Sequence, residues 1–478
     1  MSKPIKNLNF SLAKVRIFGM AMLLACGTMV SYAQQTAEVY ALKLSGELSN
    51  GKISVQNIVQ KADVISNKDT HKIKLYPEIE FQTLDGVGGA FNEIGGEALM
   101  SLPSALKDEV MTNIFSIQHG AGFTFCRTAV GASDFGMNAY SYSETPKDYN
   151  MNHFSIKREE TSVIPYIQMA YDKNPKLKVF ASPWSPPAWM KYSGYMDRGD
   201  EFSDKNHLID DPKIYNAYAL YFSKYIQAYA EKGITIDRLI IQNENDISTK
   251  YPSCVMPVSQ MSNFTKNYLR PQFNSEGIKT EIWAGTFRTA GQIDAVELAA
   301  NTNNRTLFDG IGIQYTYPKY IEQIHALYPE GQIMHTEGKC YDGKNTWEQA
   351  SKRLKEVADY INGGSPNFCY WNMILNETTE SGWGWKQNAL INIDRKGEKI
   401  TYNPDFAVMA FMSKYLKEGA KRIANFSRED LISVTFNGKI YVLIQNDKEA
   451  HQTYEYQVGN EEGHVVEIPG HSMAVIVI

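Results

Sequence analysis

The feature that most constrains the fold is an alternation of short apolar runs with helix-like stretches, repeated eight times between residues 81 and 410. Several of these runs are almost continuously apolar, as expected of parallel strands that are buried on both faces. Strands that alternate with helices indicate β/α units arranged around a parallel sheet. The eight predicted strands are Phe81–Phe91, Gly122–Arg127, Leu177–Ser182, Arg238–Gln242, Thr280–Gly285, Phe308–Tyr315, Gln332–Glu337 and Asn367–Met373.

A helix with clear boundary signals follows the third predicted strand. Asp211 can cap this helix, Pro212 suits its first position, and Gly233 can end it. Eight strand–helix units in about 330 residues are typical of a (β/α)8 barrel, or TIM barrel. We therefore predict an α/β fold in which residues 81–410 form such a barrel.

The two flanks of this region follow a different pattern. Residues 34–80 and 411–478 contain short β-like runs, separated by turn residues such as Gly459-Asn460 and Pro469-Gly470. We interpret these flanks as the N-terminal and C-terminal parts of one all-β sandwich. This side domain would pack beside the barrel and would be built from both ends of the chain.

The first 33 residues are predicted to be an export signal. Four basic residues and no acidic residue accompany an apolar segment, Ile17–Val30, which is too short to span a bilayer comfortably. Ser31-Tyr32-Ala33 provides a small-x-small cleavage site, so we expect a periplasmic or extracellular protein. The alternative is a bacterial lipoprotein box at Leu23–Cys26, which would leave a lipid anchor on Cys26. The apolar run continues past Cys26 to the Ala33 site, which favours simple secretion.

The composition excludes several classes of protein. Hydrophobic residues make up 43% and charged residues 21%, which is ordinary for a soluble globular protein. The formal net charge is -5 without a basic block, so a nucleic-acid partner is not expected. The cysteine spacings match neither a disulfide framework nor a zinc site, and the sequence contains no phosphate loop or dinucleotide fingerprint. We therefore expect neither a metal nor a cofactor, and no membrane-spanning segment.

Two glutamates stand out because they end the fourth and seventh predicted strands. In a β/α barrel the active residues lie at the carboxyl ends of the strands, so Glu244 and Glu337 would face each other across the mouth. Such a pair is what glycosidic cleavage needs: a nucleophile and a proton donor about 5–5.5 Å apart for retention, against about 6.5–9.5 Å for inversion. The proton donor requires a raised pKa, which burial and a neighbouring carboxylate would provide. Other candidate residues lie at or shortly after the ends of the second, third, fourth and eighth predicted strands: Arg127 and Asp134, Trp184, Asn243, and Trp371.

Each of these residues also has a structural explanation when it is taken alone. A glutamate at a strand end often caps the next helix. Arg127 could form a structural ion pair, and Trp371 could be a core aromatic. The occurrence of all of them at the ends of the appropriate strands favours an active site, in which Asn243 could bind a sugar 2-hydroxyl and the tryptophans could stack on a sugar ring.

The motifs together resemble those of glycoside hydrolase family 30, which includes lysosomal glucosylceramidase and bacterial β-1,6-glucanases. The resemblance covers nearly the whole chain after the export signal. It is carried by Leu84–Phe91, Phe125–Arg127, Ser133–Phe135, Ser182–Trp184, Asn243-Glu244, Tyr402–Pro404 and Ile468–Ala474. It implies a β/α barrel with a two-ended β-sandwich and a retaining mechanism, in which Glu244 is the acid/base and Glu337 the nucleophile. The residues that it implies for the first sugar subsite are Arg127, Asp134, Trp184, Asn243, Tyr315, Trp371, Trp385 and Asn388.

The sequence departs from the family pattern at three strand ends. Asn92-Glu93 stands where the family often has Thr-Asp, and Asn245 stands where a proline usually follows the Asn-Glu pair. The sixth strand often ends in His-Trp-Tyr in the family, whereas here it ends in Gln314–Tyr317. Either Tyr315 or Tyr317 could therefore contact the nucleophile. The departures leave both glutamates in place, but they affect strands that line the sugar subsite.

Two hypotheses of different classes follow. The leading one is a retaining β-glycosidase that acts on β-glucosides or β-1,6-glucan, with β-xyloside, β-fucoside and β-galactan as alternative substrates. The second is an exported, non-catalytic glycan-binding protein, against which the joint presence of Glu244, Glu337, Arg127 and Asp134 speaks. A serine or zinc hydrolase lacks support, because the sequence contains neither Gly-x-Ser-x-Gly nor His-Glu-x-x-His.

Overall fold

The computed structural model describes residues 37–58, 60, 70–199, 204–427 and 430–478. The predicted export signal, including Cys26, lies outside the described residues. Within the described part of the chain, no helix combines the length and the apolar character that crossing a membrane requires.

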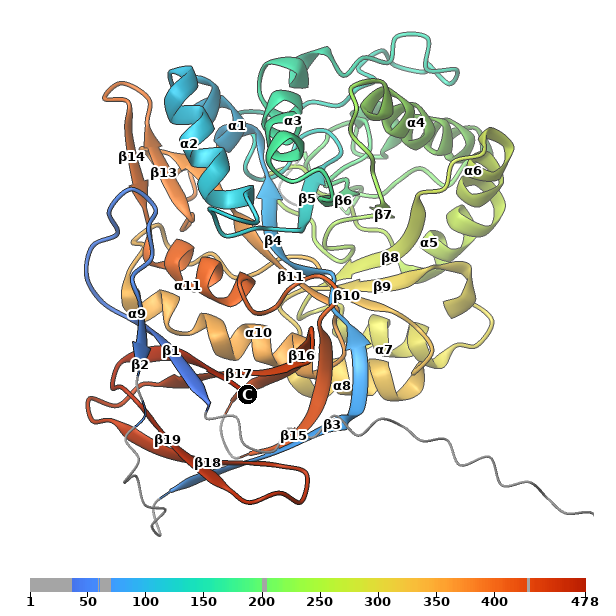
Figure 1. The fold of residues 1–478 in the computed structure, drawn as a ribbon. Helices are drawn as coiled ribbons and strands as arrows, with labels where there is room; N and C mark the ends of the chain where they lie inside the picture. Colours follow the sequence, from blue (N-terminus) through green and yellow to red (C-terminus); the bar gives the residue numbers. More distant parts are fainter. Residues whose placement is uncertain (1–36, 59, 61–69, 200–203, 428–429) are drawn as a thin grey trace, which may run out of the picture. The chain divides into compact units, whose positions relative to one another are not determined.

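An eight-stranded parallel barrel forms the centre of the described chain (Figure 1). Strands β4 to β10 pair in chain order and β11 pairs with β4, which gives the order β10-β9-β8-β7-β6-β5-β4-β11. A parallel bridge between Gly338 and Tyr370, together with bonds from the Asn367 side chain to the backbone of His335, closes the barrel between β10 and β11. The strands are β4 (Gly86–Phe91), β5 (Phe125–Ala129), β6 (Lys178–Ser182), β7 (Arg238–Ile240), β8 (Glu281–Phe287), β9 (Gly310–Ile313), β10 (Ile333–His335) and β11 (Asn367–Asn372).

All eight predicted barrel strands are confirmed, with altered bounds. The first shows the largest difference, because the predicted strand Phe81–Phe91 spans two elements. Strand β3 (His71–Thr83) belongs to the sheet of the chain ends, and β4 begins at Gly86. Gly86 has a φ of 103°, and a Cβ there would lie 2.0 Å from the Thr124 hydroxyl, so only glycine allows the chain to turn into the barrel at this point.

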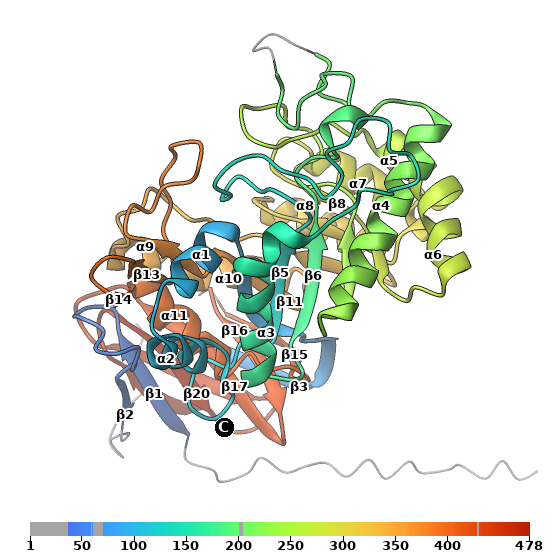
Figure 2. The same cartoon turned by 90° about the horizontal axis from the view of Figure 1, so that it is seen from above.

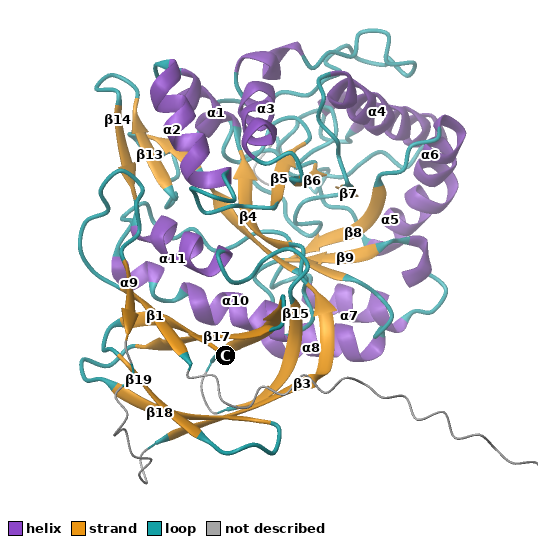
Figure 3. Cartoon of the chain, viewed as in Figure 1, coloured by secondary structure: helices purple, strands orange, loops and turns teal. Residues whose placement is uncertain are grey.

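The helices lie outside the barrel strands (Figure 3). The predicted helix after the third strand is α4 (Pro212–Glu231), in which the Asp211 side chain accepts a hydrogen bond from the Lys213 amide. Seen from above, α4, α6 (Arg270–Glu276) and α7 (Gln292–Ala300) lie on the side of the barrel away from β1 (Glu38–Lys43) and β2 (Val55–Ile58) (Figure 2). The remaining helices of six residues or more are α1 (Glu93–Met100), α2 (Ser104–Phe115), α3 (Val163–Lys173), α5 (Val258–Phe264), α6 (Arg270–Glu276), α7 (Gln292–Ala300), α8 (Pro318–Leu327), α10 (Arg353–Asn362) and α11 (Pro404–Ser413).

The two chain ends combine into one mixed sheet of nine strands, in the order β19-β18-β3-β15-β16-β17-β20-β1-β2. The prediction that both ends build one all-β region is therefore confirmed, but hydrogen bonds join all the strands into a single sheet. Strand β1 also contacts β19 near the other end of the order, so the sheet folds back on itself. The new strands are β1 (Glu38–Lys43), β2 (Val55–Ile58), β15 (Lys421–Phe426), β16 (Ile432–Phe436), β17 (Lys439–Asn446), β18 (Gln452–Val458), β19 (His464–Ile468) and β20 (Ser472–Val477).

A layer of large side chains fills the inside of the barrel. Six strands contribute one residue each, and all six side chains are fully buried. Arg238 lies over two of these rings and pairs with Asp85 and Glu281. This layer makes the inside of the barrel a packed core. Polar side chains meet instead at the mouth that the carboxyl ends of the strands form. The members of the layer are Phe125, Phe180, Ile240, Trp283, Met334 and Cys369.

Candidate active site

The two predicted glutamates meet at the barrel mouth. Glu244 follows the fourth barrel strand and Glu337 the seventh, and their residues are 9% and 6% exposed. Gln314 directly follows the sixth strand. Its side-chain nitrogen, Nε2, lies 3.2 Å from Glu244 Oε1 and 3.4 Å from Glu337 Oε2. These two carboxylate oxygens are therefore no further apart than the sum of those distances, which accommodates the separation that retention needs.

Glu337 is surrounded by hydrogen-bond donors. Arg127 Nη1 donates to Oε2 at 2.7 Å, and the Tyr315 hydroxyl donates to Oε1 at 2.5 Å. Burial raises the pKa of Glu337, while Arg127, Tyr315 and Gln314 oppose that rise by stabilising the ionised form. A buried carboxylate whose ionised form is stabilised by three donors is suited to act as a nucleophile.

Glu244 has fewer groups that stabilise its charge. Burial and the neighbouring Glu337 raise the pKa of Glu244 to about 7, against the opposing effects of Arg288 and Gln314. A proton shared within the pair therefore rests on Glu244, the arrangement expected of a general acid near neutral pH. Glu244 also has a φ of 42°, and its amide donates to Thr286 Oγ1 at 2.9 Å, so its backbone adopts an uncommon conformation that aims the side chain.

Arg127 connects the groups around the two glutamates. It is completely buried, and it donates to Ser182 Oγ, to the Thr336 carbonyl and to Asn243 Oδ1. Because the Asn243 oxygen also accepts from Thr286, the amide nitrogen of Asn243 points away from these partners and is available to a ligand.

Two tryptophans flank the guanidinium of Arg127. It lies 4.6 Å from the ring centroid of Trp184 and 5.3 Å from that of Trp371. The two tryptophan rings stack with their centroids 5.0 Å apart. The structure thus brings five predicted residues together with the glutamate pair: Arg127, Asn243, Trp184, Trp371 and Tyr315.

Asp134 joins the same site from the loop after β5. It is buried, and among the described residues its Oδ1 has no hydrogen-bond partner. Burial and the charges of Glu337 and Glu244 raise its pKa well above the ordinary value. The indole nitrogen of Trp371 is likewise buried without a partner in the described part of the chain. An acceptor and a donor left open beside two carboxylates fit the hydroxyls of a sugar.

The structure distinguishes the two candidate tyrosines. Tyr315 contacts Glu337 directly, whereas Tyr317 is 56% exposed. Trp385 is also at the surface, 41% exposed, and its ring centroid lies 5.7 Å from that of Tyr251. Trp385 follows the eighth barrel strand and Tyr251 the fourth, which is opposite in the barrel, so this aromatic pair spans the mouth beside the carboxylates.

The hydrogen bonds of the Asn388 side chain lie outside the network around the glutamate pair. Asn388 is completely buried, and its oxygen accepts from the amides of Gly343 and Asn345. Its amide nitrogen donates to Gln349 and Asp405. These bonds tie Asn388 to the loops after β10 and β11, and the contact with a sugar that the resemblance implies stays a prediction.

Three residues of the site are not among the predicted site residues, although Gln314 and Ser182 belong to the motifs at strand ends. Gln314 contacts both glutamates, Thr286 accepts from the Glu244 amide, and Ser182 accepts from Arg127. Thr286 lies near the carboxyl end of the fifth strand and Gln314 directly follows the sixth, so an inspection of every strand end would have found both.

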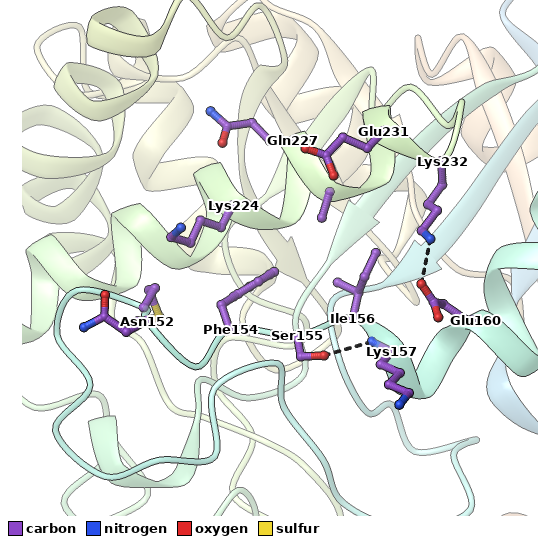
Figure 4. Close-up of a pocket in the computed structure, with 12 residues that line it drawn as sticks. Asn152, Phe154, Ser155, Ile156, Lys157, Glu160, Lys224, Gln227, Glu231 and Lys232 are labelled. Carbon is purple, nitrogen blue, oxygen red and sulfur yellow. Dashed lines mark hydrogen bonds and ion pairs between the residues drawn. The ribbon is translucent and has the colours of Figure 1, made fainter.

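A separate cavity of about 500 Å³ lies beside residues 151–157 and helix α4 (Figure 4). Its lining includes Lys224, Glu231 and an ion pair of 2.6 Å between Lys232 and Glu160. The hydrogen bond from Lys232 lowers the pKa of Glu160, the opposite of what a proton donor needs. The paired carboxylates at the barrel mouth are therefore the better candidate for catalysis.

Comparisons with known proteins agree with this geometry. A family model described as the glycosyl hydrolase family 30 TIM-barrel domain matches residues 84–416, which include every barrel strand and both glutamates. Putative glucosylceramidase 3 of Caenorhabditis elegans is 26% identical over 414 residues, covering 81% of this chain and 77% of that protein. Endo-1,6-beta-D-glucanase neg1 of Aspergillus fumigatus is 26% identical over 373 residues, covering 71% of each protein.

The fold has close counterparts among solved structures. The structure of the endo-beta1,6-glucanase BT3312 superposes with a TM-score of 0.79 at 23% identity, and covers 92% of this chain and 98% of that one. The structural likeness concerns the fold, and the family match extends over most of the chain, including the candidate site. The chain therefore belongs to glycosyl hydrolase family 30.

Proposed function

We propose that the protein is a retaining β-glycosidase that hydrolyses β-linked glucosides or β-1,6-glucan. The observation that carries the proposal is the unequal environment of two adjacent carboxylates. Glu337 receives hydrogen bonds from Arg127, Tyr315 and Gln314, whereas Glu244 receives one from Gln314 and has a pKa raised to about 7. Two carboxyl groups whose environments favour opposite protonation states supply a nucleophile and an acid.

The reaction then proceeds in two displacements. Glu337 attacks the anomeric carbon and forms a glycosyl ester while Glu244 transfers its proton to the leaving glycosidic oxygen. In the second displacement Glu244, now ionised, takes a proton from water, and the resulting hydroxide oxygen attacks the anomeric carbon and releases Glu337. Both carboxyl groups return to their starting states, and the sugar leaves with its original β configuration.

The surrounding residues fit a sugar at the point of attack. Arg127 and Tyr315 hold Glu337, and the amide nitrogen of Asn243 is free to meet a 2-hydroxyl. Asp134 and the indole of Trp371 offer an acceptor and a donor. The named relatives are glucosylceramidases and endo-1,6-β-glucanases, which favours glucose in this subsite over xylose, fucose or galactose.

Hydrolysis of a panel of aryl β-glycosides and β-linked glucans, followed by proton NMR, tests the proposal. We expect β-glucosides or β-1,6-glucan to be cleaved and the β-anomer to be formed first. An α-anomer formed first would contradict retention. Cleavage restricted to β-xylosides, β-fucosides or β-galactan would show that the subsite binds that sugar in place of glucose. Glycan binding in calorimetry without any product would favour the binding-protein alternative.

We also propose that the protein is exported, on the basis of the basic and apolar pattern of residues 1–33. Mass spectrometry of the mature protein distinguishes the two processing routes. Cleavage after Ala33 leaves Gln34 as the first residue, whereas a lipoprotein begins at a lipidated Cys26. A full-length protein recovered from the cytoplasm would contradict export.

A further inference from the structure

We infer that Gln314 is the positioning residue that holds the two catalytic carboxylates at their working separation and stabilises the ionised member of the pair. The inference deepens the proposed function and rests on it. Gln314 directly follows β9 and is completely buried. One nitrogen atom, Nε2, donates to Glu244 at 3.2 Å and to Glu337 at 3.4 Å, so a single side chain fixes the position of one carboxylate relative to the other.

The orientation of the Gln314 amide is set by its neighbour Thr336. The Thr336 hydroxyl donates to Gln314 Oε1 at 2.7 Å, and Thr336 directly precedes Glu337. In the flipped orientation the amide oxygen would face the ionised Glu337 carboxylate, and two acceptors would meet where a donor and an acceptor now meet. The hydrogen bond from Thr336 and the charge of Glu337 therefore favour the orientation in which both N–H groups of the Gln314 side chain point at the carboxyl groups.

A carboxamide has a particular advantage at this position. It donates hydrogen bonds without carrying a charge or a titrating proton, so it lowers the pKa of both glutamates without competing for the proton that they exchange. A histidine, which the family often has at this strand end, would itself titrate near neutral pH. The other ionisable groups that act on the pair are Arg127, Asp134, Asp246, Tyr251, Arg288 and Tyr315.

The substitution Gln314→Met removes both hydrogen bonds while nearly preserving the volume of the side chain. We expect kcat/KM to fall by about 10- to 100-fold, as for the loss of a hydrogen bond to a charged group. The acidic and the alkaline limb of the pH profile of kcat/KM should both move to higher pH, because each carboxylate loses a donor that favours its ionised form. Thr336→Val should move the limbs in the same direction, and the double variant should be little worse than Gln314→Met alone.

Gln292→Met is the matched control. Gln292 is a buried glutamine on α7, and its oxygen accepts from the Tyr317 amide, in the loop that follows Gln314. The control thus removes a buried amide next to the same loop without touching a carboxylate. We expect its pH limbs to coincide with those of the wild type.

A second measurement does not depend on activity. The melting temperatures of the wild type and of Gln314→Met are compared from pH 5 to pH 8. The variant should bind protons more tightly in the folded state, so its stability should fall faster as the pH rises and the difference from the wild type should grow. A side chain that contributes packing alone would give the same difference at every pH, as we expect for Gln292→Met.

The outcomes separate this inference from the proposed function. Unmoved pH limbs together with a constant melting difference would overturn the role of Gln314, even if the wild type hydrolyses β-glucosides. Lack of hydrolysis by the wild type would refute the proposed function, while the melting series would still decide whether Gln314 stabilises the ionised pair. Shifted limbs and a growing difference, both absent from Gln292→Met, support the inference.

Discussion

Arg127 and Glu337 form a buried ion pair with a distance of 2.7 Å between Nη1 and Oε2. The same guanidinium donates to Asn243, the residue before Glu244, so one cation links the ends of both catalytic strands. Arg127 makes five hydrogen bonds in all, which matches the number of its N–H groups. A cation with so complete a set of acceptors orients Glu337 as well as neutralising it.

We expect Arg127→Met to impair both catalysis and stability. Removing one member of a buried pair leaves Glu337 uncompensated, which costs about 3–5 kcal/mol. The pKa of Glu337 should rise further, so the acidic limb of kcat/KM should move to higher pH and the maximal rate should fall by about 100-fold or more. Melting curves and pH–rate profiles measure both effects. The control Arg158→Met, which breaks an ion pair with the buried Glu93, should retain the acidic limb of the wild type.

The roles of the two glutamates can be told apart by azide, a nucleophile that needs no general base. In Glu244→Ala the glycosyl ester still forms from a substrate with a good leaving group, and azide should then release a β-glycosyl azide. In Glu337→Ala azide can take the place of the nucleophile and should give an α-glycosyl azide. Without azide both variants should lose activity by about 10²- to 10⁴-fold or more. If Glu244→Ala gave the α-glycosyl azide and Glu337→Ala the β-glycosyl azide, Glu244 would be the nucleophile and Glu337 the acid/base.

The pH dependence of the wild type follows from the protonation states that the mechanism requires. The rate needs Glu244 protonated, and its pKa is raised to about 7, so kcat/KM should fall as the pH rises through about 7. The acidic limb reports the ionisation of Glu337, and the two limbs belong to the coupled pair. With a dinitrophenyl glycoside, whose leaving group needs no proton, Glu244→Gln should lose the alkaline limb. An alkaline limb that persists in this variant would assign it to another group.

Stability should depend on the same ionisation. The pKa of Glu244 is raised on folding, so its contribution to stability is present below about 4.5 and is lost as the pH rises to about 7. Glu244→Gln has no carboxyl group that can ionise at this position. Its free energy of unfolding, relative to that of the wild type, should therefore increase by about 1–3 kcal/mol between pH 5 and pH 8. Melting temperatures of both proteins at pH 5 and pH 8 test the direction of this change in stability. The exposed control Glu109→Gln should shift the melting temperature equally at both, and equal shifts for Glu244→Gln would contradict the prediction.

Much of the barrel could be predicted from the sequence because parallel strands leave a local signature. Strands such as Phe125–Ala129 and Asn367–Asn372 are buried almost throughout, so their apolar runs are readable without knowledge of their neighbours. The strand order of the chain-end sheet has no such signature. There β18 pairs in parallel with β3, from the opposite end of the chain, and this register depends on contacts between distant segments.

The site was predictable to the extent that its residues lie at strand ends. Glu244, Glu337 and Arg127 meet because the barrel brings all carboxyl ends to one mouth. Asn388 lies beyond this rule, because after the eighth strand the chain forms three further strands before it reaches α11, the last of them β14 (Lys399–Tyr402). Asn388 follows the first of these strands, β12 (Ile374–Asn376), and precedes the second, β13 (Ile391–Asp394). The conformation of the loop between them, and therefore the place of Asn388, is set by tertiary hydrogen bonds that no local pattern reveals.

Trp385 and Asn388 come from this same loop, and the structure predicts opposite effects for them. Asn388→Ala removes four hydrogen bonds from a buried side chain and should destabilise the protein by about 1–3 kcal/mol, with KM nearly unchanged. Trp385 packs against Tyr251 at the mouth and is 41% exposed, so Trp385→Ala should leave the melting temperature nearly unchanged. Its KM should rise about tenfold, equivalent to about 1.4 kcal/mol of lost binding. A rise in KM with unchanged stability for Asn388→Ala would instead return this residue to the sugar subsite, as the sequence resemblance implied.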